Sequence, residues 1–144
     1  MKFCIFYIIF MTILFHTIKA HGLDMEAIKQ IESGGNPNAY NEHAQAKGLY
    51  QITPICLKEY NNYHEEKIKN EDLFNEKLNY KIAKWYLDVR IPQMLKYYGK
   101  RLTNRNKIIS YNAGISYVVE NKDLPKETEN YIIKYNKITK GGRL

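Results

Sequence analysis

The stretch Phe74-Asn-Glu-Lys-Leu78-Asn-Tyr-Lys-Ile82-Ala-Lys-Trp85-Tyr-Leu-Asp-Val89 carries the clearest structural pattern of the chain. Its five numbered apolar residues recur every three or four positions, so they share one face of a helix. We expect this stripe to belong to a protein core. Pro92 is expected to kink or end the helix, and Gly99 to end the turn or two that follow.

Capping residues predict where two earlier helices begin and end. Asp24 is a suitable N-cap for the first of them, with Leu23 placed to pack on Ile28. The run Ser33-Gly34-Gly35 should end this helix, because glycine suits a left-handed C-terminal turn. Thr53-Pro54 then starts a second helix, with a hydroxyl cap and proline in the first turn.

The remainder of the chain also favours helices joined by polar loops. Residues 36–47 lack apolar periodicity and are expected to form a loop, whereas 108–114 and the segment after Pro125 continue as helices. No sustained alternation of apolar and polar residues indicates strands. We therefore predict an all-α fold in one domain, which suits a length of 144 residues.

The first 20 residues differ in character from the rest. Lys2 precedes an apolar run over 3–15, and Ala20 is a small residue suited to a cleavage site, so 1–20 is predicted to be a signal peptide and 21–144 the exported domain. An uncleaved anchor is the alternative, although thirteen helical residues cover only ~20 Å of a bilayer core. Cys4 would leave with the signal, and Cys56 would remain as a core residue without a disulfide partner.

The chain is basic, with 22 Lys and Arg against 15 Asp and Glu, or 22 − 15 = +7. Removing Lys2 and Lys19 with the signal leaves 7 − 2 = +5. This charge favours an anionic partner, but a solvated basic surface explains it equally well. Export argues against an intracellular nucleic acid partner, and the His residues show no ligand spacing with Cys56, so no metal is expected.

Glu32 is the first candidate catalytic residue. It lies in the last turn of the first predicted helix, where the negative end of the helix dipole opposes a second negative charge. A carboxyl in this position should hold its proton longer, as a general acid working near neutral pH requires. A surface glutamate without a function is the alternative reading.

Four motifs accompany Glu32 in order along the chain. They are Ile31-Glu32-Ser33-Gly34-Gly35, Gly48-Leu49-Tyr50-Gln51, Ser110-Tyr111-Asn112-Ala113-Gly114 and Glu127-Thr128-Glu129-Asn130-Tyr131. In this order the sequence resembles the SLT-type lytic transglycosylases, which cleave peptidoglycan and are relatives of goose-type lysozyme. The resemblance spans about residues 23–138.

This resemblance implies a lysozyme-like helical fold with a substrate groove, peptidoglycan glycan strands as the partner, and no cofactor. It further implies that Glu32 protonates the oxygen that bridges N-acetylmuramic acid and N-acetylglucosamine, so that the β-1,4 bond breaks. Glu32 then acts as base on the C6 hydroxyl of the muramic acid, and a 1,6-anhydro ring closes without water. The matching motif positions imply substrate contacts for Ser33, Gln51, Tyr111, Asn112 and Tyr131. Tyr111 and Tyr131 can offer hydroxyls to Glu32 or rings to a sugar, and Asn112 can also shape the loop.

The sequence departs from the family pattern at several positions. Tyr50 replaces a Met, Ser110 replaces an Ala, 44–47 stands where a glycine-bearing turn is common, and Asn41 stands where many members have a Ser. These departures concern substrate contacts rather than Glu32.

Two other functions remain open at this point. A hydrolytic lysozyme would need a second carboxylate to position water, for which Glu42 and Glu59 are the nearest candidates. A basic exported binding module would use lysines such as Lys81, Lys84 and Lys96 without chemistry. The protein is expected in the periplasm or cell envelope, as a monomer. Three biological roles stay open: remodelling of the wall, assembly of an envelope-spanning secretion or conjugation apparatus, and lysis by a phage.

Overall fold

The computed structural model describes residues 22–141, so the predicted signal peptide lies outside the described residues. Helices dominate this part of the chain, as predicted, and the all-α fold class is confirmed. In chain order the elements are α1 (Met25–Ser33), β1 (Tyr40–Asn41), β2 (Ala46–Lys47), α2 (Pro54–His64), the 3-10 helix η1 (Asn70–Phe74), α3 (Glu76–Trp85), the π-helical turn η2 (Tyr86–Arg90), α4 (Ile91–Tyr97), α5 (Asn104–Asn112), α6 (Ile115–Val119) and α7 (Lys126–Gly141).

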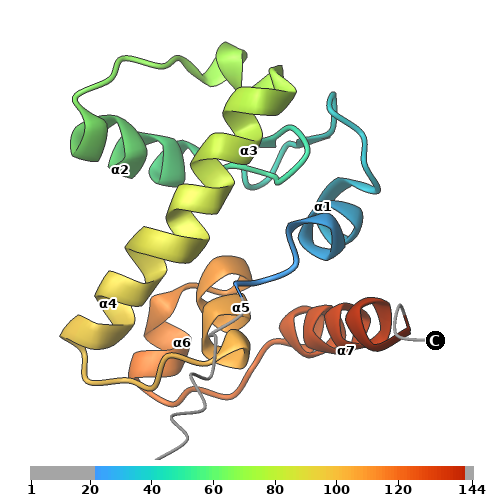
Figure 1. The fold of residues 1–144 in the computed structure, drawn as a ribbon, viewed down its shortest axis with the longest axis vertical. Coiled ribbons are helices and arrows are strands. Elements are labelled where there is room, and N and C mark those ends of the chain that lie inside the picture. The colour runs from blue at the N-terminus through green and yellow to red at the C-terminus, as the bar shows by residue number, and fades with distance from the viewer. Residues whose placement is uncertain (1–21, 142–144) are drawn as a thin grey trace, which may run out of the picture.

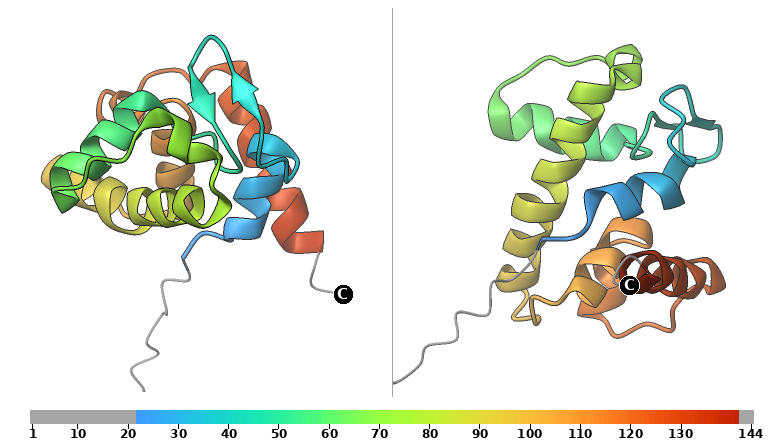
Figure 2. Two further views of the ribbon diagram at one scale, coloured as in Figure 1. Left: turned by 90° about the horizontal axis from the view of Figure 1, so that it is seen from above. Right: turned by 45° about the vertical axis from the view of Figure 1, so that its right-hand side comes forward.

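The segment from α3 through η2 to α4 forms one long path through the molecule (Figure 1). Helix α2 lies on one side of this path and α1 with the β1–β2 hairpin on the other (Figure 1). Helix α5 contacts α4, α6 and α7, and α1 packs on α7. Two further views show the hairpin beyond the end of α1 (Figure 2). Within residues 22–141, no helix is both long enough and apolar enough to cross a bilayer.

The predicted caps of α1 and α2 are confirmed. The Asp24 side chain accepts hydrogen bonds from the backbone N–H groups of Glu26 and Ala27, and Gly34 ends α1 in the left-handed conformation with φ 63°. Thr53 caps α2 through its hydroxyl, with Pro54 in the first turn. Local hydrogen bonds of this kind are readable from sequence because each spans only a few residues.

The central stripe differs from the prediction at its start, and of the two outcomes predicted for Pro92, a kink or an end of the helix, the end is not observed. Phe74 lies in η1 and is exposed, because Asn75 caps the next helix and α3 starts only at Glu76. Pro92 does not end the path. The N–H of Ile91 bonds to the carbonyl of Tyr86 in the wider π turn, so Pro92 falls in the first turn of α4, where its missing N–H costs little.

The β1–β2 hairpin and helix α6 were absent from the sequence prediction. Residues 36–47, predicted to be a loop, contain the antiparallel pair β1–β2, with Tyr40 opposite Lys47. Helix α6 follows Gly114 directly. Strands of two residues and a helix of five are too short to show a hydrophobic period, so their sequences carried no signal.

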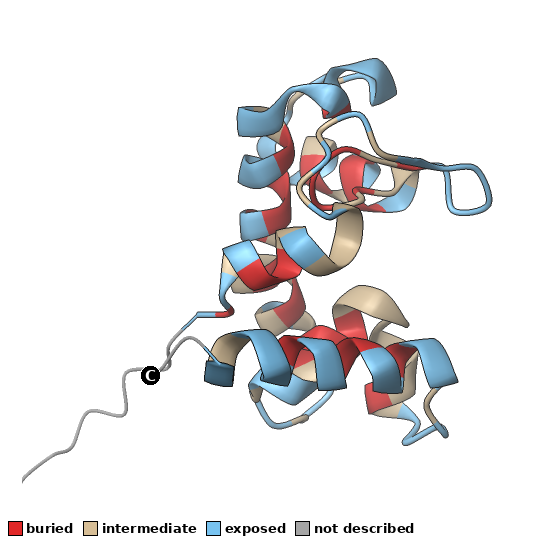
Figure 3. Cartoon of the chain, turned by 90° about the vertical axis from the view of Figure 1, so that its right-hand side faces the viewer, coloured by how far each residue is buried: buried red, intermediate tan, exposed pale blue. Residues whose placement is uncertain are grey.

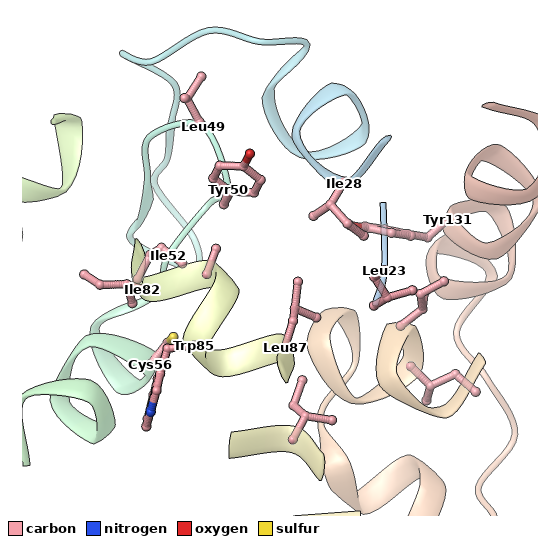
Figure 4. Packing of buried hydrophobic residues seen from close by; sticks show 14 of the residues in the cluster. Leu23, Ile28, Leu49, Tyr50, Ile52, Cys56, Ile82, Trp85, Leu87 and Tyr131 are labelled. Atoms are coloured by element: carbon pink, nitrogen blue, oxygen red, sulfur yellow. The ribbon is translucent and has the colours of Figure 1, made fainter. Parts of the chain in front are cut away.

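The core fills the space between the central path and the surrounding helices. Buried residues lie on the inward sides of the helices, as the burial colours show (Figure 3). Cys56 is buried and free, as predicted, and packs with Ile52 and Trp85 (Figure 4). Tyr131 lies beside Ile28 in another part of the same core (Figure 4). The core therefore ties α7 to α1, and this contact positions the candidate site.

Candidate active site

A cavity of about 510 Å³ lies where the ends of α1 and α5 meet the starts of α2 and α7. Four of the predicted site residues line it: Glu32, Gln51, Tyr111 and Asn112. They come from three regions of the chain, which the fold brings together.

Glu32 projects into this cavity from the last turn of α1. The Tyr131 hydroxyl donates a hydrogen bond to Glu32 Oε1 at 2.9 Å. The pKa of Glu32 is raised from 4.5 to about 7. Removal of the carboxyl from water is the largest cause, the Tyr131 hydrogen bond lowers the pKa, and the negative charge of Glu127 raises it. Burial is thus the main cause of the raised pKa, and not the helix end from which it was predicted.

Tyr131 itself is buried and belongs to α7. Burial, and then the charge of Glu32, raises the pKa of its hydroxyl well above the ordinary value, so Tyr131 remains a neutral donor at physiological pH. The prediction that Tyr131 presents its hydroxyl to Glu32 matches this geometry.

Ser33 and Tyr111 make their hydrogen bonds to the backbone of the second motif. Ser33 Oγ donates to the carbonyl oxygen of Leu49 at 2.9 Å, and Ser33 is not among the residues that line the cavity. The Tyr111 hydroxyl donates to the carbonyl oxygen of Tyr50 at 2.6 Å, and therefore not to Glu32. Both side chains fix the Leu49–Tyr50 backbone against the ends of α1 and α5.

Asn79 holds the second motif from the opposite side and was not among the predicted site residues. It is fully buried in α3, its Nδ2 donates to the carbonyl oxygens of Lys47 and Leu73, and its Oδ1 accepts from the N–H of Tyr50, each at 2.8 Å. A Cβ at Gly48, whose φ is 78°, would lie 2.4 Å from Asn79 Nδ2. Only glycine fits there, which explains the first residue of the motif.

The Asn79 position did carry a signal in the sequence. Asn79 stands three residues before buried Ile82, on the face of α3 that points to the core. A polar residue at a core position normally has hydrogen-bond partners and a structural reason to be there.

Gln51 lines the cavity with an unusual backbone conformation. Its φ is 49°, in the left-handed region that a glutamine rarely adopts. Its Nε2 donates to the carbonyl oxygens of Gly48 at 2.9 Å and Ala39 at 3.3 Å. The amide donors are thus used within the protein, and Oε1 is left to accept a hydrogen bond from a ligand.

Asn112 connects the ends of two helices beside the cavity. Its Oδ1 accepts a hydrogen bond of 2.6 Å from Thr128 Oγ1, and Thr128 is buried. Glu127, the residue before Thr128, lies exposed in the first turn of α7 and lines the same cavity as Glu32. Glu127 belongs to the fourth sequence motif, but its residue type and position alone did not indicate a role.

The model of the transglycosylase SLT domain family matches residues 15–134. This chain belongs to that family. Membership implies lytic transglycosylase activity on peptidoglycan, and hence a location outside the cytoplasm. No curated protein and no solved structure gives a significant match to this SLT domain. The match begins within the predicted signal peptide, and the boundary at residue 20 stays a prediction.

The positions where this SLT domain departs from the family pattern fall in two environments. Asn41, Ala44, Ala46 and Ser110 line the cavity with Glu32. Tyr50 is instead buried in the core, with its ring 5.8 Å from that of Tyr80. The departure at Tyr50 therefore changes packing behind the second motif.

The carboxylates considered for hydrolysis lie elsewhere in this SLT domain. Glu42 is exposed and does not line the cavity of Glu32. Glu59 pairs with Arg90 at 2.6 Å and lines a different cavity. Glu127 is the carboxylate that shares the cavity with Glu32.

Two of the three lysines considered for a binding module have acidic partners. Lys81 pairs with Glu66 at 3.2 Å and Lys84 with Asp88 at 2.6 Å, both near the surface. Such pairs reduce the charge that these lysines offer to a polyanion.

Proposed function

We propose that this chain cleaves the β-1,4 bond between N-acetylmuramic acid and N-acetylglucosamine without water, using Glu32 as acid and then as base. The observation that carries the proposal is the Glu32 carboxyl, which lines the cavity with a pKa raised to about 7. At that pKa roughly half of the carboxyls are protonated at neutral pH, so both forms are accessible.

In the first step, Glu32 gives its proton to the oxygen that bridges the two sugars, and the bond from that oxygen to C1 breaks. The carbonyl oxygen of the substrate's own acetamide forms a bond to C1 and takes up the positive charge. This substrate assistance replaces the second carboxylate of most glycosidases.

In the second step, the Glu32 carboxylate takes the proton from the C6 hydroxyl of the muramic acid. O6 then bonds to C1 while the acetamide oxygen leaves it, which closes the 1,6-anhydro ring. Glu32 ends the cycle protonated, and no water is consumed.

Tyr131 and Glu127 act in opposite directions on the protonation of Glu32, which must serve first as acid and then as base. The Tyr131 hydrogen bond occupies Oε1 and favours the carboxylate, while the negative charge of Glu127 favours the acid. Burial is the main cause of the raised pKa of Glu32, and these two opposed effects adjust it. Gln51 and Tyr111 line the cavity, and in this proposal they contact the sugars as the family resemblance implies. Ser33 and Asn112 support the backbone and helix ends around them.

The product ends provide the test. Digestion of purified peptidoglycan should release muropeptides that end in 1,6-anhydro-muramic acid, each lighter by one water molecule than the lysozyme product, as measured by mass spectrometry. Reducing muramic ends would contradict the proposal and indicate hydrolysis. Glu127 would then be the first candidate to position the water, ahead of Glu42 and Glu59.

A further inference from the structure

The net positive charge of the chain is concentrated in one stretch of the sequence. Residues 89–119 contain six Lys and Arg and no Asp or Glu, whereas the predicted mature chain as a whole carries +5. The rest of the mature chain therefore has a net charge of 5 − 6 = −1. Such a concentration of one sign of charge attracts an anionic partner.

Four of these six side chains make no ion pair within residues 22–141: Lys96, Lys100, Arg101 and Arg105. The other two, Arg90 and Lys107, pair with Glu59 and Asp88. The four cations without a pair lie at the end of α4, in its connection to α5 and in the first turn of α5, at one end of the molecule (Figure 1). Their charge is therefore available to a ligand.

A basic cavity of about 430 Å³ lies at this end of the molecule. It is lined by four cations and by no acidic residue: Lys100, Arg101, Arg105 and Lys122. Lys122 pairs with Glu120 at 3.1 Å, and Asn106 and Asn121 add amide groups to the lining. Guanidinium, ammonium and amide groups all donate hydrogen bonds, so the cavity suits phosphate oxygens.

A more apolar cavity of about 610 Å³ adjoins the basic one, and the two share Gly99 and Lys100. Its apolar lining comes from Val89, Pro92 and Leu102. Asp88 also lines it, but this carboxylate already pairs with two lysines of the domain. The connection from α4 to α5 thus lies between a basic and an apolar hollow.

Large apolar side chains project from the same connection. Tyr97 is 83% exposed and Tyr98 is 49% exposed, with their rings 5.0 Å apart, and Leu102 is 57% exposed. Neighbouring apolar side chains that are this exposed indicate an interaction surface. Tyrosine is typical of the interface between a membrane and water, because its ring is apolar and its hydroxyl is polar.

The mixture of cations and exposed rings favours a lipid surface over a dissolved polyanion. A dissolved polyanion would use the cations and leave the rings in water. A bilayer with anionic headgroups uses both, because its phosphates attract Lys and Arg while its interface takes up the rings.

The described domain also begins at this end of the molecule. A Cβ on Gly22 would lie 3.6 Å from Asp88 Oδ1, and Asp88 lines the apolar cavity. The apolar run of the predicted signal ends at residue 15, and the seven residues from there to Gly22 span at most about 25 Å. A bilayer that holds this run during export therefore lies within reach of the same surface.

We propose that this surface docks the domain on an anionic phospholipid membrane. The docking patch consists of the three exposed apolar residues and the four cations that have no ion pair: Tyr97, Tyr98, Leu102, Lys96, Lys100, Arg101 and Arg105. The cations contact lipid phosphates, and the apolar side chains enter the interface.

Docking leaves the cavity of Glu32 accessible. No residue of the docking patch lines that cavity. Tyr86 does line it, and Tyr97 follows eleven residues later, about 16 Å farther along the helical path. A docked domain can therefore bind a glycan strand and a membrane at the same time.

The first experiment measures sedimentation of the protein with lipid vesicles. The protein is purified from cells that express the full chain, and its N-terminus is sequenced. It should bind vesicles of equal parts phosphatidylglycerol and phosphatidylcholine, bind phosphatidylcholine alone much more weakly, and lose affinity as salt is added. Equal binding to both kinds of vesicle, or no binding to either, would overturn the proposal.

Neutralising two cations tests the place of contact. Lys100→Gln/Arg101→Gln should weaken binding to the anionic vesicles by about 25-fold, at roughly fivefold for each cation. Lys67→Gln/Lys77→Gln makes the same change in net charge at exposed residues outside the patch and should bind like the parent. An equal loss in both double variants would mean that only the net charge matters, and would remove the patch.

Tyr97 tests whether side chains enter the bilayer. Tyr97→Ser should weaken binding by about three- to tenfold, whereas Tyr97→Phe keeps the ring and should bind like the parent. Tyr63→Ser is the matched control, because Tyr63 is 53% exposed and lies outside the patch. The emission of Tyr97→Trp should be quenched by lipids with brominated acyl chains, whereas the single natural tryptophan, Trp85, is buried and should not be quenched.

Two further outcomes separate this proposal from its rivals. Polyglutamate binding as tight as vesicle binding, with no effect of Tyr97→Ser and no quenching, would indicate an acidic protein or polymer as the partner and overturn membrane docking. The inference does not depend on the proposed reaction. Lys100→Gln/Arg101→Gln should still cleave dissolved wall fragments, so a loss of vesicle binding with cleavage intact would support docking as a separate function.

Discussion

The Tyr131 hydroxyl donates a hydrogen bond of 2.9 Å to Glu32 Oε1, although the two residues lie 99 positions apart in the chain. The bond joins α7 to the end of α1 beside the cavity. It favours the ionised carboxyl, against a larger effect of burial that favours the acid. The pKa of Glu32 is the result of this competition, and it can be moved in either direction by mutation.

Glu32→Gln should abolish wall cleavage while the protein stays folded. The amide keeps the shape of the carboxyl and can still accept the Tyr131 hydrogen bond, but it cannot deliver a proton. The measurement is the clearing of purified walls, with circular dichroism to confirm the fold. Glu42→Gln makes the same chemical change at an exposed residue outside the cavity and should clear walls normally. Near-parental clearing by Glu32→Gln would remove Glu32 from the reaction.

The same substitution should stabilise the protein at alkaline pH. The folded-state pKa of Glu32 is raised from 4.5 to about 7, so its contribution to stability is full below pH 4.5 and is lost as the pH rises through 7. The glutamine side chain does not titrate, so the variant avoids this loss of unfolding free energy, which is at most about 3 kcal/mol. The difference in Tm between variant and parent should therefore be more favourable to the variant at pH 8 than at pH 4. A difference that does not change with pH would mean that burial does not raise this pKa.

Tyr131→Phe should move the pH dependence of the reaction upward. Loss of the hydrogen bond removes the effect that lowers the pKa of Glu32, so the acid persists to higher pH. The alkaline limb of the kcat/KM profile should shift to higher pH, and kcat should fall by about tenfold because the carboxyl loses one orienting contact.

Glu127→Gln should shift the alkaline limb of the kcat/KM profile in the direction opposite to Tyr131→Phe. The negative charge of Glu127 raises the pKa of Glu32, so its removal should shift the alkaline limb to lower pH. If both variants shifted the limb in the same direction, the titrating group would not be Glu32. A complete loss of activity in Glu127→Gln without any shift would point to a direct role of Glu127 in the chemistry.

Export should remove the first 20 residues. N-terminal sequencing of protein recovered from the cell envelope should begin near His21, because the apolar run over 3–15 and Ala20 form a signal peptide pattern. Recovery of the chain with its Met1 end intact would instead indicate an uncleaved anchor.

The sequence by itself determined those features that depend on neighbours a few residues away. Asp24, Gly34 and Thr53 act through hydrogen bonds or backbone angles within one turn of their own helix, so their roles could be read from the residue types. The position of Glu32 at the end of α1 follows from the same local signals. The order of the four motifs sufficed to predict the SLT family and the helical fold.

Only the tertiary structure decided how Glu32 is tuned and how the cavity is built. The pKa of Glu32 depends on burial and on Tyr131 and Glu127, which reach it from a helix at the far end of the chain. Asn79 fixes the backbone of the second motif from α3. No local sequence pattern predicts with which backbone groups a buried amide will form hydrogen bonds. Burial and long-range hydrogen bonds are properties of packed surfaces, and these surfaces exist only after distant segments have come together.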